Sequence, residues 1–284
     1  MPRDPRYRYL LVDVDGTLLD SRGAVSTRTL RALERAVAAG LTLVLATGRT
    51  YNSLRRITEG AGLPPFHMIT NGGAVGLTPG GAAVRYTAYL APGEWRQVVA
   101  ALEGEGLAPL VFSHQHPEPP LFWVGQEAGG PHFGAYLARN RMYCRVAPAL
   151  TRTEIPRVVE VAALGRDAAF DAASARVLER FAGRMRCHSM RLPINREPGR
   201  ITEFFAAGTS KWQAFLGLFP EAAGHAQQVI AVGDEINYLE MIRAAGLGVA
   251  MGNAIPAVQA AAQRVTADLD HDGLATVLES VLDG

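Results

Sequence analysis

The stretch that decides the fold reads YLLVDVDGT over residues 9–17. Its apolar part, Tyr9–Val14, is near-continuous in Leu and Val, which is typical of a parallel strand covered on both faces. Asp13 and Asp15 come at its end, and the chain turns at Gly16, so Asp15 can swing beside Asp13. Two carboxylates that close repel each other unless a cation lies between them. Oxygen ligands with room left for water favour Mg²⁺ as that cation.

Other interpretations of this aspartate pair compete with a catalytic one. The pair can belong to a plain loop of turn-forming residues, or to the DxD motif of a nucleotide-sugar transferase, although such motifs rarely follow the first strand so closely. An EF-hand loop is excluded, because its sixth position would be Leu18 instead of Gly and its twelfth Ala24 instead of Glu. A catalytic role is favoured.

Further apolar runs repeat the character of the first strand, and helical patterns lie between them. Ser26 is placed to cap a helix whose apolar residues recur at helical spacing, and Gly40 stands where such a helix ends. Strands alternating with helices predict a doubly wound, Rossmann-like α/β domain with a parallel sheet. The expected strands after the first are Leu41–Ala46, His67–Ile69, Gln228–Val232 and Leu247–Met251.

The α/β pattern is interrupted in the middle of the chain. From about residue 89 to residue 200 the sequence is richer in aromatic residues and prolines, and the core-like pattern resumes near Ile201. We therefore predict a core formed by residues 1–88 and 201–284, with an inserted α+β cap domain at 89–200. Such an insert would lie over the carboxyl ends of the strands, where open α/β sheets bind ligands, and would set substrate specificity.

Composition narrows the class of protein. The 284 residues are 48% hydrophobic and 19% charged, which predicts a substantial folded core, and the net charge of +1 gives no reason to expect nucleic acid or an anionic membrane as partner. No apolar run approaches the roughly 20 residues that span a bilayer. Cys144 and Cys187 do not form a CxxC motif. We expect a cytoplasmic protein, monomeric or homodimeric.

Three more groups stand at the ends of predicted strands or at the start of a helix. Thr47 and Gly48 follow one strand and offer a hydroxyl and open backbone N–H groups to an anion, although Thr-Gly also ends many ordinary strands. Asp234 follows another strand, as a third potential metal ligand. Asn237 can donate and accept hydrogen bonds, so it can bridge a phosphate and the catalytic loop. Gly-Asp is otherwise common turn chemistry.

Lys211 is the only lysine among 28 basic residues. It follows Ser210, a good N-cap, so it would stand near a helix N-terminus that already favours anions. A compact ammonium group is not mimicked by the planar guanidinium group that the other basic residues carry. The competing interpretation is a solvated surface lysine.

Read in order, these elements resemble the haloacid dehalogenase superfamily of phosphohydrolases, specifically the Cof-type sugar-phosphate phosphatases. The resemblance covers both ends of the chain, while residues 89–200 match in placement and size only. The motifs that carry it are DVDGTLLD at 13–20, ATGR at 46–49, NGG at 71–73, TSKW at 209–212, GDEINYLEM at 233–241, VAMGNA at 249–254 and DGLA at 272–275.

The resemblance implies a role for each strand-end residue. Asp13 would be the nucleophile and a metal ligand, and Asp15 the acid/base that also lends its backbone carbonyl to the metal. Asp234 would complete the Mg²⁺ site. Lys211 would clamp both the phosphate and the nucleophile. The residues that would hold the phosphate are Val14 (through its main chain), Thr47, Gly48, Lys211 and Asn237.

One position departs from the family pattern. The family usually reads GDxxND, and the final aspartate is here Tyr238, a phenol that stays neutral near pH 7. Its loss would weaken Mg²⁺ binding or slow turnover unless Glu235 or another group compensates.

The function expected is therefore a Mg²⁺-dependent phosphatase that hydrolyses a small phosphorylated metabolite, such as a sugar phosphate, through an aspartyl-phosphate. A phosphotransferase or phosphomutase on the same scaffold is the alternative enzyme. A catalytically weak protein that binds phosphorylated metabolites is the alternative from another class, and it is motivated by Tyr238.

Overall fold

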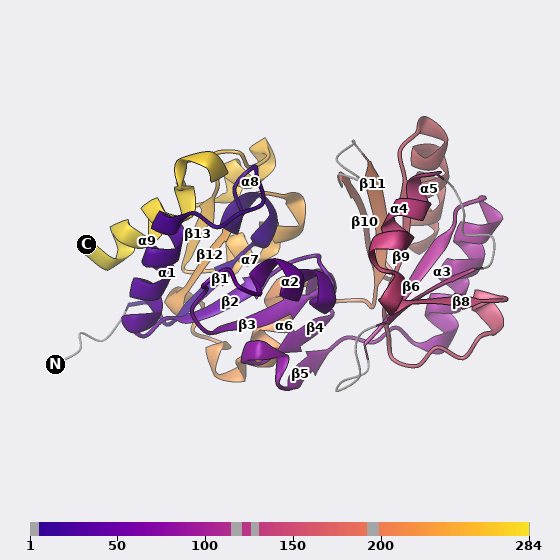
Figure 1. Cartoon of the computed structure of the whole chain (residues 1–284), viewed down its shortest axis with the longest axis horizontal. Helices are drawn as coiled ribbons and strands as arrows, with labels where there is room; N and C mark the ends of the chain where they lie inside the picture. Colours follow the sequence, from indigo (N-terminus) through magenta and orange to yellow (C-terminus); the bar gives the residue numbers. More distant parts are fainter. Residues whose placement is uncertain (1–5, 115–120, 126–130, 192–198, 284) are drawn as a thin grey trace. The chain divides into compact units, whose positions relative to one another are not determined.

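The computed structural model describes residues 6–114, 121–125, 131–191 and 199–283 (Figure 1). The chain divides into two compact units. A core unit is formed by Met1–Tyr86 and Ser210–Gly284, and an inserted unit by Thr87–Thr209.

The core unit contains, within the described residues, a sheet of eight strands in the order β14-β13-β12-β1-β2-β3-β4-β5. Strand β1 lies between β12 and β2 and runs parallel to both, with Val12 paired to Val232 on one side and to Leu45 on the other. All the strands expected from the apolar runs are present in this sheet. Its strands are β1 (Tyr9–Val12), β2 (Thr42–Ala46), β3 (Phe66–Thr70), β4 (Val75–Leu77), β5 (Val84–Thr87), β12 (Val229–Gly233), β13 (Leu247–Ala250) and β14 (Arg264–Val265).

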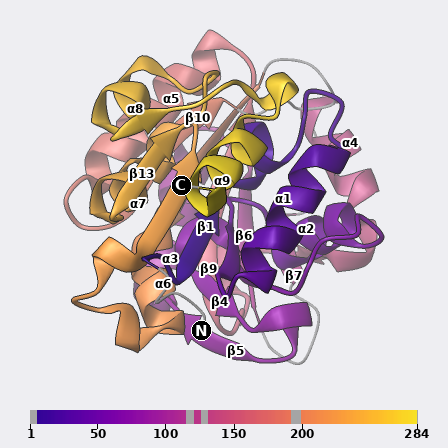
Figure 2. The same cartoon turned by 90° about the vertical axis from the view of Figure 1, so that its left-hand side faces the viewer.

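Helices pack around this sheet, with α1 against α9 and α6 against α7 (Figure 2). The predicted serine caps are confirmed: Ser26 Oγ accepts the Thr29 N–H at 3.0 Å at the start of α1, and Ser210 Oγ accepts the Gln213 N–H at 3.0 Å at the start of α6. The predicted α/β fold is confirmed. The core helices are α1 (Thr27–Ala38), α2 (Tyr51–Thr58), α6 (Lys211–Leu218), α7 (Leu239–Ala244), α8 (Pro256–Ala261) and α9 (Gly273–Asp283).

The inserted unit has its own sheet, whose described strands run in the order β10-β11-β9-β6-β7-β8. All its pairings are antiparallel except that of β7 with β8. Helices α3 and α5 contribute Trp95 and Phe181 to a core that also holds Val161 and Phe204 of the sheet. The elements are α3 (Pro92–Gly104), β6 (Pro109–Ser113), β7 (Leu121–Gly125), α4 (Pro131–Arg139), β8 (Cys144–Ala147), β9 (Val158–Gly165), α5 (Ala168–Phe181), β10 (Arg186–Arg191) and β11 (Arg200–Phe205).

Strand β11 changes where the insert ends. The prediction assigned residues 201–209 to the core, because the apolar run that starts near Ile201 resembles a returning core strand. In the structure β11 pairs with β9 and β10, and the compact core resumes only at Ser210. An antiparallel partner far along the chain decides this placement, and local composition does not reveal it.

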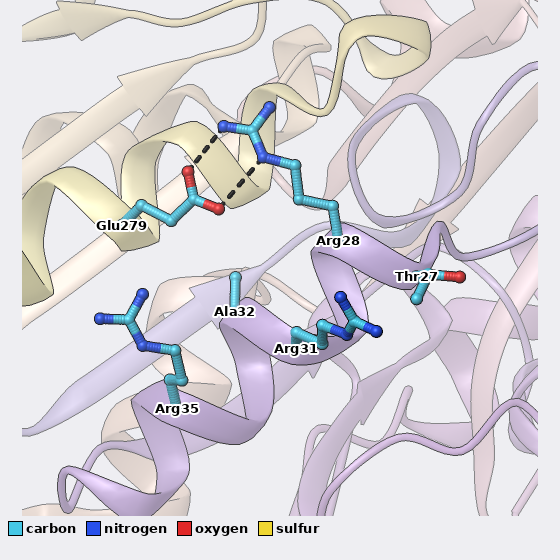
Figure 3. A pocket seen from close by; sticks show the side chains of 6 residues that line it. All are labelled: Thr27, Arg28, Arg31, Ala32, Arg35 and Glu279. Carbon is cyan, nitrogen blue, oxygen red and sulfur yellow. Dashed lines mark hydrogen bonds and ion pairs between the residues drawn. The ribbon is translucent and has the colours of Figure 1, made fainter.

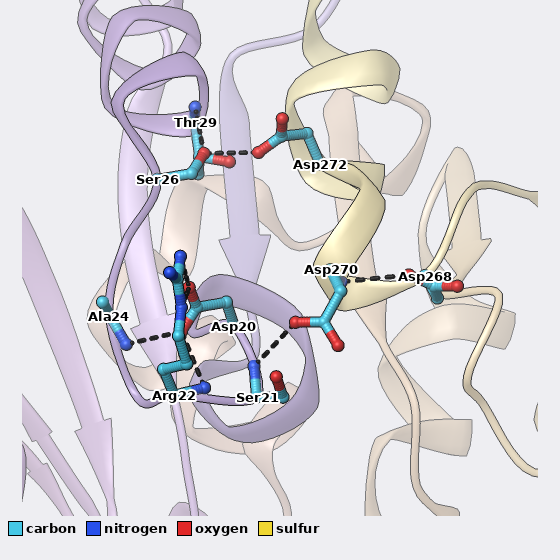
Figure 4. Close-up of polar contacts among 9 residues, drawn as sticks. All are labelled: Asp20, Ser21, Arg22, Ala24, Ser26, Thr29, Asp268, Asp270 and Asp272. Carbon is cyan, nitrogen blue, oxygen red and sulfur yellow. Dashed lines mark hydrogen bonds and ion pairs between the residues drawn. The ribbon is translucent and has the colours of Figure 1, made fainter.

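The chain that follows β1 is tied to the segment before α9 (Figure 4). Asp20 accepts the backbone N–H groups of Arg22 and Ala24, each at 2.9 Å, and closes the loop on itself. Ser21 N–H donates to Asp270 at 3.0 Å, and the Ser26 hydroxyl bonds to Asp272. These contacts hold the exit of the DVDGT segment against the C-terminal part of the core. None of the described helices is long and apolar enough to cross a membrane.

Candidate active site

Asp13 lies at the carboxyl end of β1, between two parallel strands that lead to different parts of the chain. Its N–H donates to the Val232 carbonyl at 3.0 Å, so the residue continues the ladder to β12. Its side chain is completely buried. One carboxylate oxygen accepts the Val14 N–H at 2.5 Å and the other accepts the Thr17 hydroxyl at 3.2 Å. The predicted turn is present, because Gly16 adopts a φ of +82°.

Asp234 follows β12 and lies beside Asp13. Its Oδ2 accepts Asn253 Nδ2 at 3.3 Å, and the same amide donates to the Gly16 carbonyl at 3.0 Å. A Cβ at Gly16 would collide with the Asp234 carboxylate, so only glycine allows this approach. The Oδ1 atom of Asp234 is buried and has no hydrogen-bond partner. A buried acceptor in that state is suited to bind a cation or a proton.

The pKa values of both carboxylates are raised, in each case mainly by burial. Burial, and then the charge of Asp234, raise the pKa of Asp13 well above its usual value. Burial raises the pKa of Asp234 to about 6. Among the described residues no three His, Cys, Asp or Glu side chains gather as a metal cluster. Mg²⁺ needs only one or two carboxylates and keeps several waters, so Asp13 and Asp234 fit that ion.

The side chain of Asp15 does not join this pair. It forms a bidentate ion pair with Arg49, whose Nε and Nη2 lie 2.7 and 2.6 Å from the two Asp15 oxygens. Arg49 also donates from Nη1 to the Ser53 hydroxyl at 2.9 Å. About half of the Asp15 side chain, 54%, is exposed, so a proton or a substrate atom has access to it.

Thr47 and Gly48 follow β2, the neighbour of β1. Thr47 is buried, its N–H donates to the Ile69 carbonyl at 2.9 Å, and its hydroxyl accepts the Arg49 N–H at 3.1 Å. A Cβ added at Gly48 would meet no atom within 4 Å, so the space beside this backbone is open. The strand end thus offers a hydroxyl and an unobstructed backbone.

Lys211 begins α6 and is buried, with 1% of its surface exposed. Its Nζ donates to the Asn237 carbonyl at 3.3 Å and lies 3.8 Å from the centre of the Tyr238 ring. The predicted surface alternative for this lysine is therefore wrong. Gly73, at a φ of +106°, brings the NGG loop against the backbone of Ser210, where a side chain would collide.

Asn237 and Tyr238 lie on the short helix Ile236–Tyr238, and both are buried. The Tyr238 hydroxyl forms a hydrogen bond with the Asp13 carboxylate. Burial, and then the charge of Asp13, raise the pKa of Tyr238 well above its usual value, so the phenol remains protonated and donates. The carboxylate of Glu235, the residue considered as a substitute for the missing aspartate, accepts the N–H of Ile236 at 3.3 Å.

Contacts therefore link Asp13 to Asp234, to Tyr238 and, through the Tyr238 ring, to Lys211. Sequence reasoning did not single out Arg49, Asn253 or Thr17, although all three lie inside the quoted motifs. The usable signal was their position three to five residues beyond a strand end, where polar side chains of an α/β sheet converge.

The core unit also contains a pocket that is lined by other residues than those described above. It lies beside α1 and is lined by the residues that Figure 3 shows: Thr27, Arg28, Arg31, Ala32, Arg35 and Glu279. Arg28 pairs with Glu279 at 2.6 Å, and Arg35 pairs with Asp283 at 2.5 Å. Exposed ion pairs of this kind contribute little to stability, and none of the predicted site residues lines the pocket.

Comparison with known proteins matches the chain to a family described as haloacid dehalogenase-like hydrolase, over residues 10–123 and 144–278. A 5-amino-6-(5-phospho-D-ribitylamino)uracil phosphatase of Bacillus subtilis is 26% identical, over 97% of this chain and 96% of its own length. A pyridoxal phosphate phosphatase of Escherichia coli is 25% identical, over 97% and 98%. A haloacid dehalogenase-like hydrolase structure from Bacteroides thetaiotaomicron has a TM-score of 0.78 at 23% identity, over 97% of this chain and 99% of that chain.

Proposed function

The chain belongs to the haloacid dehalogenase-like hydrolases, and on that premise we propose that it is a Mg²⁺-dependent phosphatase acting through an aspartyl-phosphate on Asp13. The resemblance predicted from the motifs is confirmed, and so is the enzyme class. The observation that carries the proposal is the completely buried Asp13 carboxylate at the end of β1, flanked by Asp234 at the end of β12. The two curated relatives are phosphatases of small phosphorylated metabolites, and we extend that substrate class to this chain.

Asp13 is the attacking group. Hydrogen bonds from the Val14 N–H and the Thr17 hydroxyl fix its carboxylate at the strand end. Attack by one of its oxygens on phosphorus breaks the bond to the leaving oxygen and splits one difficult displacement into two easier steps. Water then attacks the phosphorus of the aspartyl-phosphate and frees Asp13.

Asp15 moves the protons. It gives one to the leaving oxygen in the first step and takes one from water in the second, which is typically worth ~10²–10⁴-fold in rate. Its bidentate pair with Arg49 fixes the carboxylate in one orientation. The pair must loosen during the cycle, because a protonated Asp15 has only one free acceptor oxygen for the guanidinium.

The charge of the phosphoryl group has several partners. Asp13 and Asp234, with the backbone carbonyl of Asp15, would hold Mg²⁺. When bound, the ion neutralises charge on the phosphoryl oxygens, usually the largest contribution to such a reaction. Lys211 supplies a second positive charge. The main chain at Val14, together with Thr47, Gly48 and Asn237, completes the proposed phosphate cradle.

The inserted unit, whose bounds are near those of the predicted insert at residues 89–200, is proposed to select the substrate. Lids of this kind exclude water and contact the leaving group. A cytoplasmic location and a monomeric or homodimeric state belong to this proposal as well.

A panel of phosphorylated metabolites and an aryl phosphate, each with and without Mg²⁺, tests the function. The expected result is Mg²⁺-dependent release of inorganic phosphate that disappears in Asp13→Asn. Asp167→Asn is the matched control, because Asp167 also accepts a backbone N–H, that of Phe170 at 2.7 Å, but lies in the insert. Phosphate found only on an added sugar would indicate a phosphotransferase, and no turnover of any substrate would contradict the proposal.

A further inference from the structure

Tyr238 makes two contacts that packing alone does not require. Its hydroxyl is hydrogen-bonded to the Asp13 carboxylate, and its ring face lies 3.8 Å from Lys211 Nζ. Only 5% of the residue is exposed. One neutral side chain therefore touches both the proposed nucleophile and the proposed phosphate clamp.

The backbone around the ring is shaped for it. A Cβ added at Gly233 would lie 2.9 Å from both Cβ and Cγ of Tyr238, closer than real contacts of this kind. Any side chain at position 233 would therefore displace the ring from beneath Lys211. Gly233 ends β12 directly before Asp234, so the strand that supplies the second carboxylate also leaves the space for the phenol.

The charges explain why a phenol serves here. Asp13 and Asp234 already stand close together in a buried site, and a third carboxylate would add repulsion whenever no cation is bound. The ring face attracts the Lys211 ammonium without adding charge. The hydroxyl donates to Asp13, which a carboxylate cannot do in its ionised form.

We propose that Tyr238 is a positioning residue, whose hydroxyl orients Asp13 for attack and whose ring orients Lys211 toward the phosphate. The inference rests on the proposed function for its kinetic tests, but not for its metal-binding test. It also predicts that the site binds Mg²⁺ more weakly than one with a carboxylate at this position.

Tyr238→Phe isolates the hydroxyl. We expect kcat to fall about ten- to a hundredfold, the effect of losing a hydrogen bond to a charged group, with KM nearly unchanged. Tyr9→Phe is the matched control, because it removes the hydroxyl of another buried tyrosine. Tyr9 lies on β1, and its hydroxyl is bonded to Glu221 at 3.0 Å. A kcat within about twofold of the parent protein would overturn the role of the hydroxyl.

Tyr238→Leu isolates the ring by comparison with Tyr238→Phe. Without the ring, Lys211 loses the surface that holds its ammonium, so KM should rise about tenfold above that of Tyr238→Phe. Thermal melting of both variants separates this effect from a loss of folding. Equal KM values in two folded variants would overturn the role of the ring.

Tyr238→Asp tests the charge, by calorimetric titration with Mg²⁺ alone. The added carboxylate should tighten Mg²⁺ binding about tenfold and lower the melting temperature of the metal-free protein. This readout needs no turnover, so it still decides the inference if the parent protein proves inactive on every phosphate ester. Unchanged Mg²⁺ affinity, or an undiminished melting temperature without metal, would contradict the account of the charges.

Discussion

The two compact units bury polar side chains in different places. In the core unit Asp13, Thr47 and Lys211 stand where a strand ends or a helix begins. In the insert Thr202 and Glu203 lie within β11, and each has a partner directly across on β10. Thr202 Oγ1 is 3.3 Å from the Ser189 hydroxyl, and Glu203 is 3.0 Å from His188.

This difference shows which buried polar groups can perform chemistry. Parallel strands all end at the same edge of a sheet, so their polar ends converge on a common point and face a ligand. Polar groups in the middle of antiparallel strands instead satisfy one another across the ladder. In the core, Asp13, Thr47 and Lys211 lie where a parallel strand ends or a helix begins, whereas in the insert Thr202 and Glu203 pair across the sheet.

The largest expected effect concerns apolar packing in each unit. Phe181→Ala should destabilise the insert by about 3–5 kcal/mol, because Phe181 is buried and packs edge-on against Phe204. Hydrogen exchange should accelerate within residues 87–209 and not in β1. Phe215→Ala, at an equally buried position of α6, should do the reverse. Equal acceleration in both units by either variant would show that they do not behave as separate bodies.

The next effect concerns the buried charge of the core. Lys211→Met keeps a long apolar side chain and removes the ammonium that lies over the Tyr238 ring. We expect kcat/KM to fall about 10²–10³-fold on an aryl phosphate, the usual loss for one electrostatic contact with developing charge. The melting temperature should hold, because a buried cation is removed. A loss of stability with activity retained would make Lys211 a structural residue.

A pH series tests whether the carboxylates of the core are strained without metal. The pKa of Asp234, raised to about 6 from 3.8, makes its stabilising contribution complete below about pH 4 and lost as the pH rises through about 6. Asp234→Asn has no carboxyl group at this position, so its stability does not fall with pH for this reason. In the presence of a chelator, urea unfolding should show the variant gaining about 2–3 kcal/mol on the parent protein between about pH 4 and pH 7. A difference that does not vary with pH would contradict it.

The smallest effect compares two buried threonines. Thr47→Val and Thr202→Val remove the same hydroxyl, one at the end of β2 and one within β11. The first should lower kcat/KM about tenfold with little change in stability, and the second should cost about 1 kcal/mol of stability with activity retained. Paired kinetic and unfolding measurements decide this, and the opposite pattern would remove the contrast between the two units.

The strands and caps of the core were predictable from sequence because each depends on neighbours in the chain. Near-continuous apolar runs marked the buried parallel strands, and Ser26 and Ser210 cap their helices as expected. The end of the insert was not predictable, because β11 pairs antiparallel with distant β9.

The side-chain partners within the site could not be predicted from the sequence either. The Asp15 side chain could lie beside Asp13 and a cation, or it could pair with Arg49. Only the folded backbone brings Arg49 Nε within 2.7 Å of the Asp15 carboxylate. The departure at Tyr238 was visible as a residue type, yet its orientation depends on the space that Gly233 leaves. Geometry of this kind follows from tertiary packing.

The central claim, that Asp13 carries the phosphoryl group, is tested most directly by quenching a single turnover in acid and mapping the protein by mass spectrometry. The account predicts that the peptide containing Asp13 gains the mass of one phosphoryl group, and that hydroxylamine removes it. The same peptide from Asp13→Asn should remain unmodified. Phosphorylation at another residue, or turnover in which no peptide is ever modified, would contradict the account.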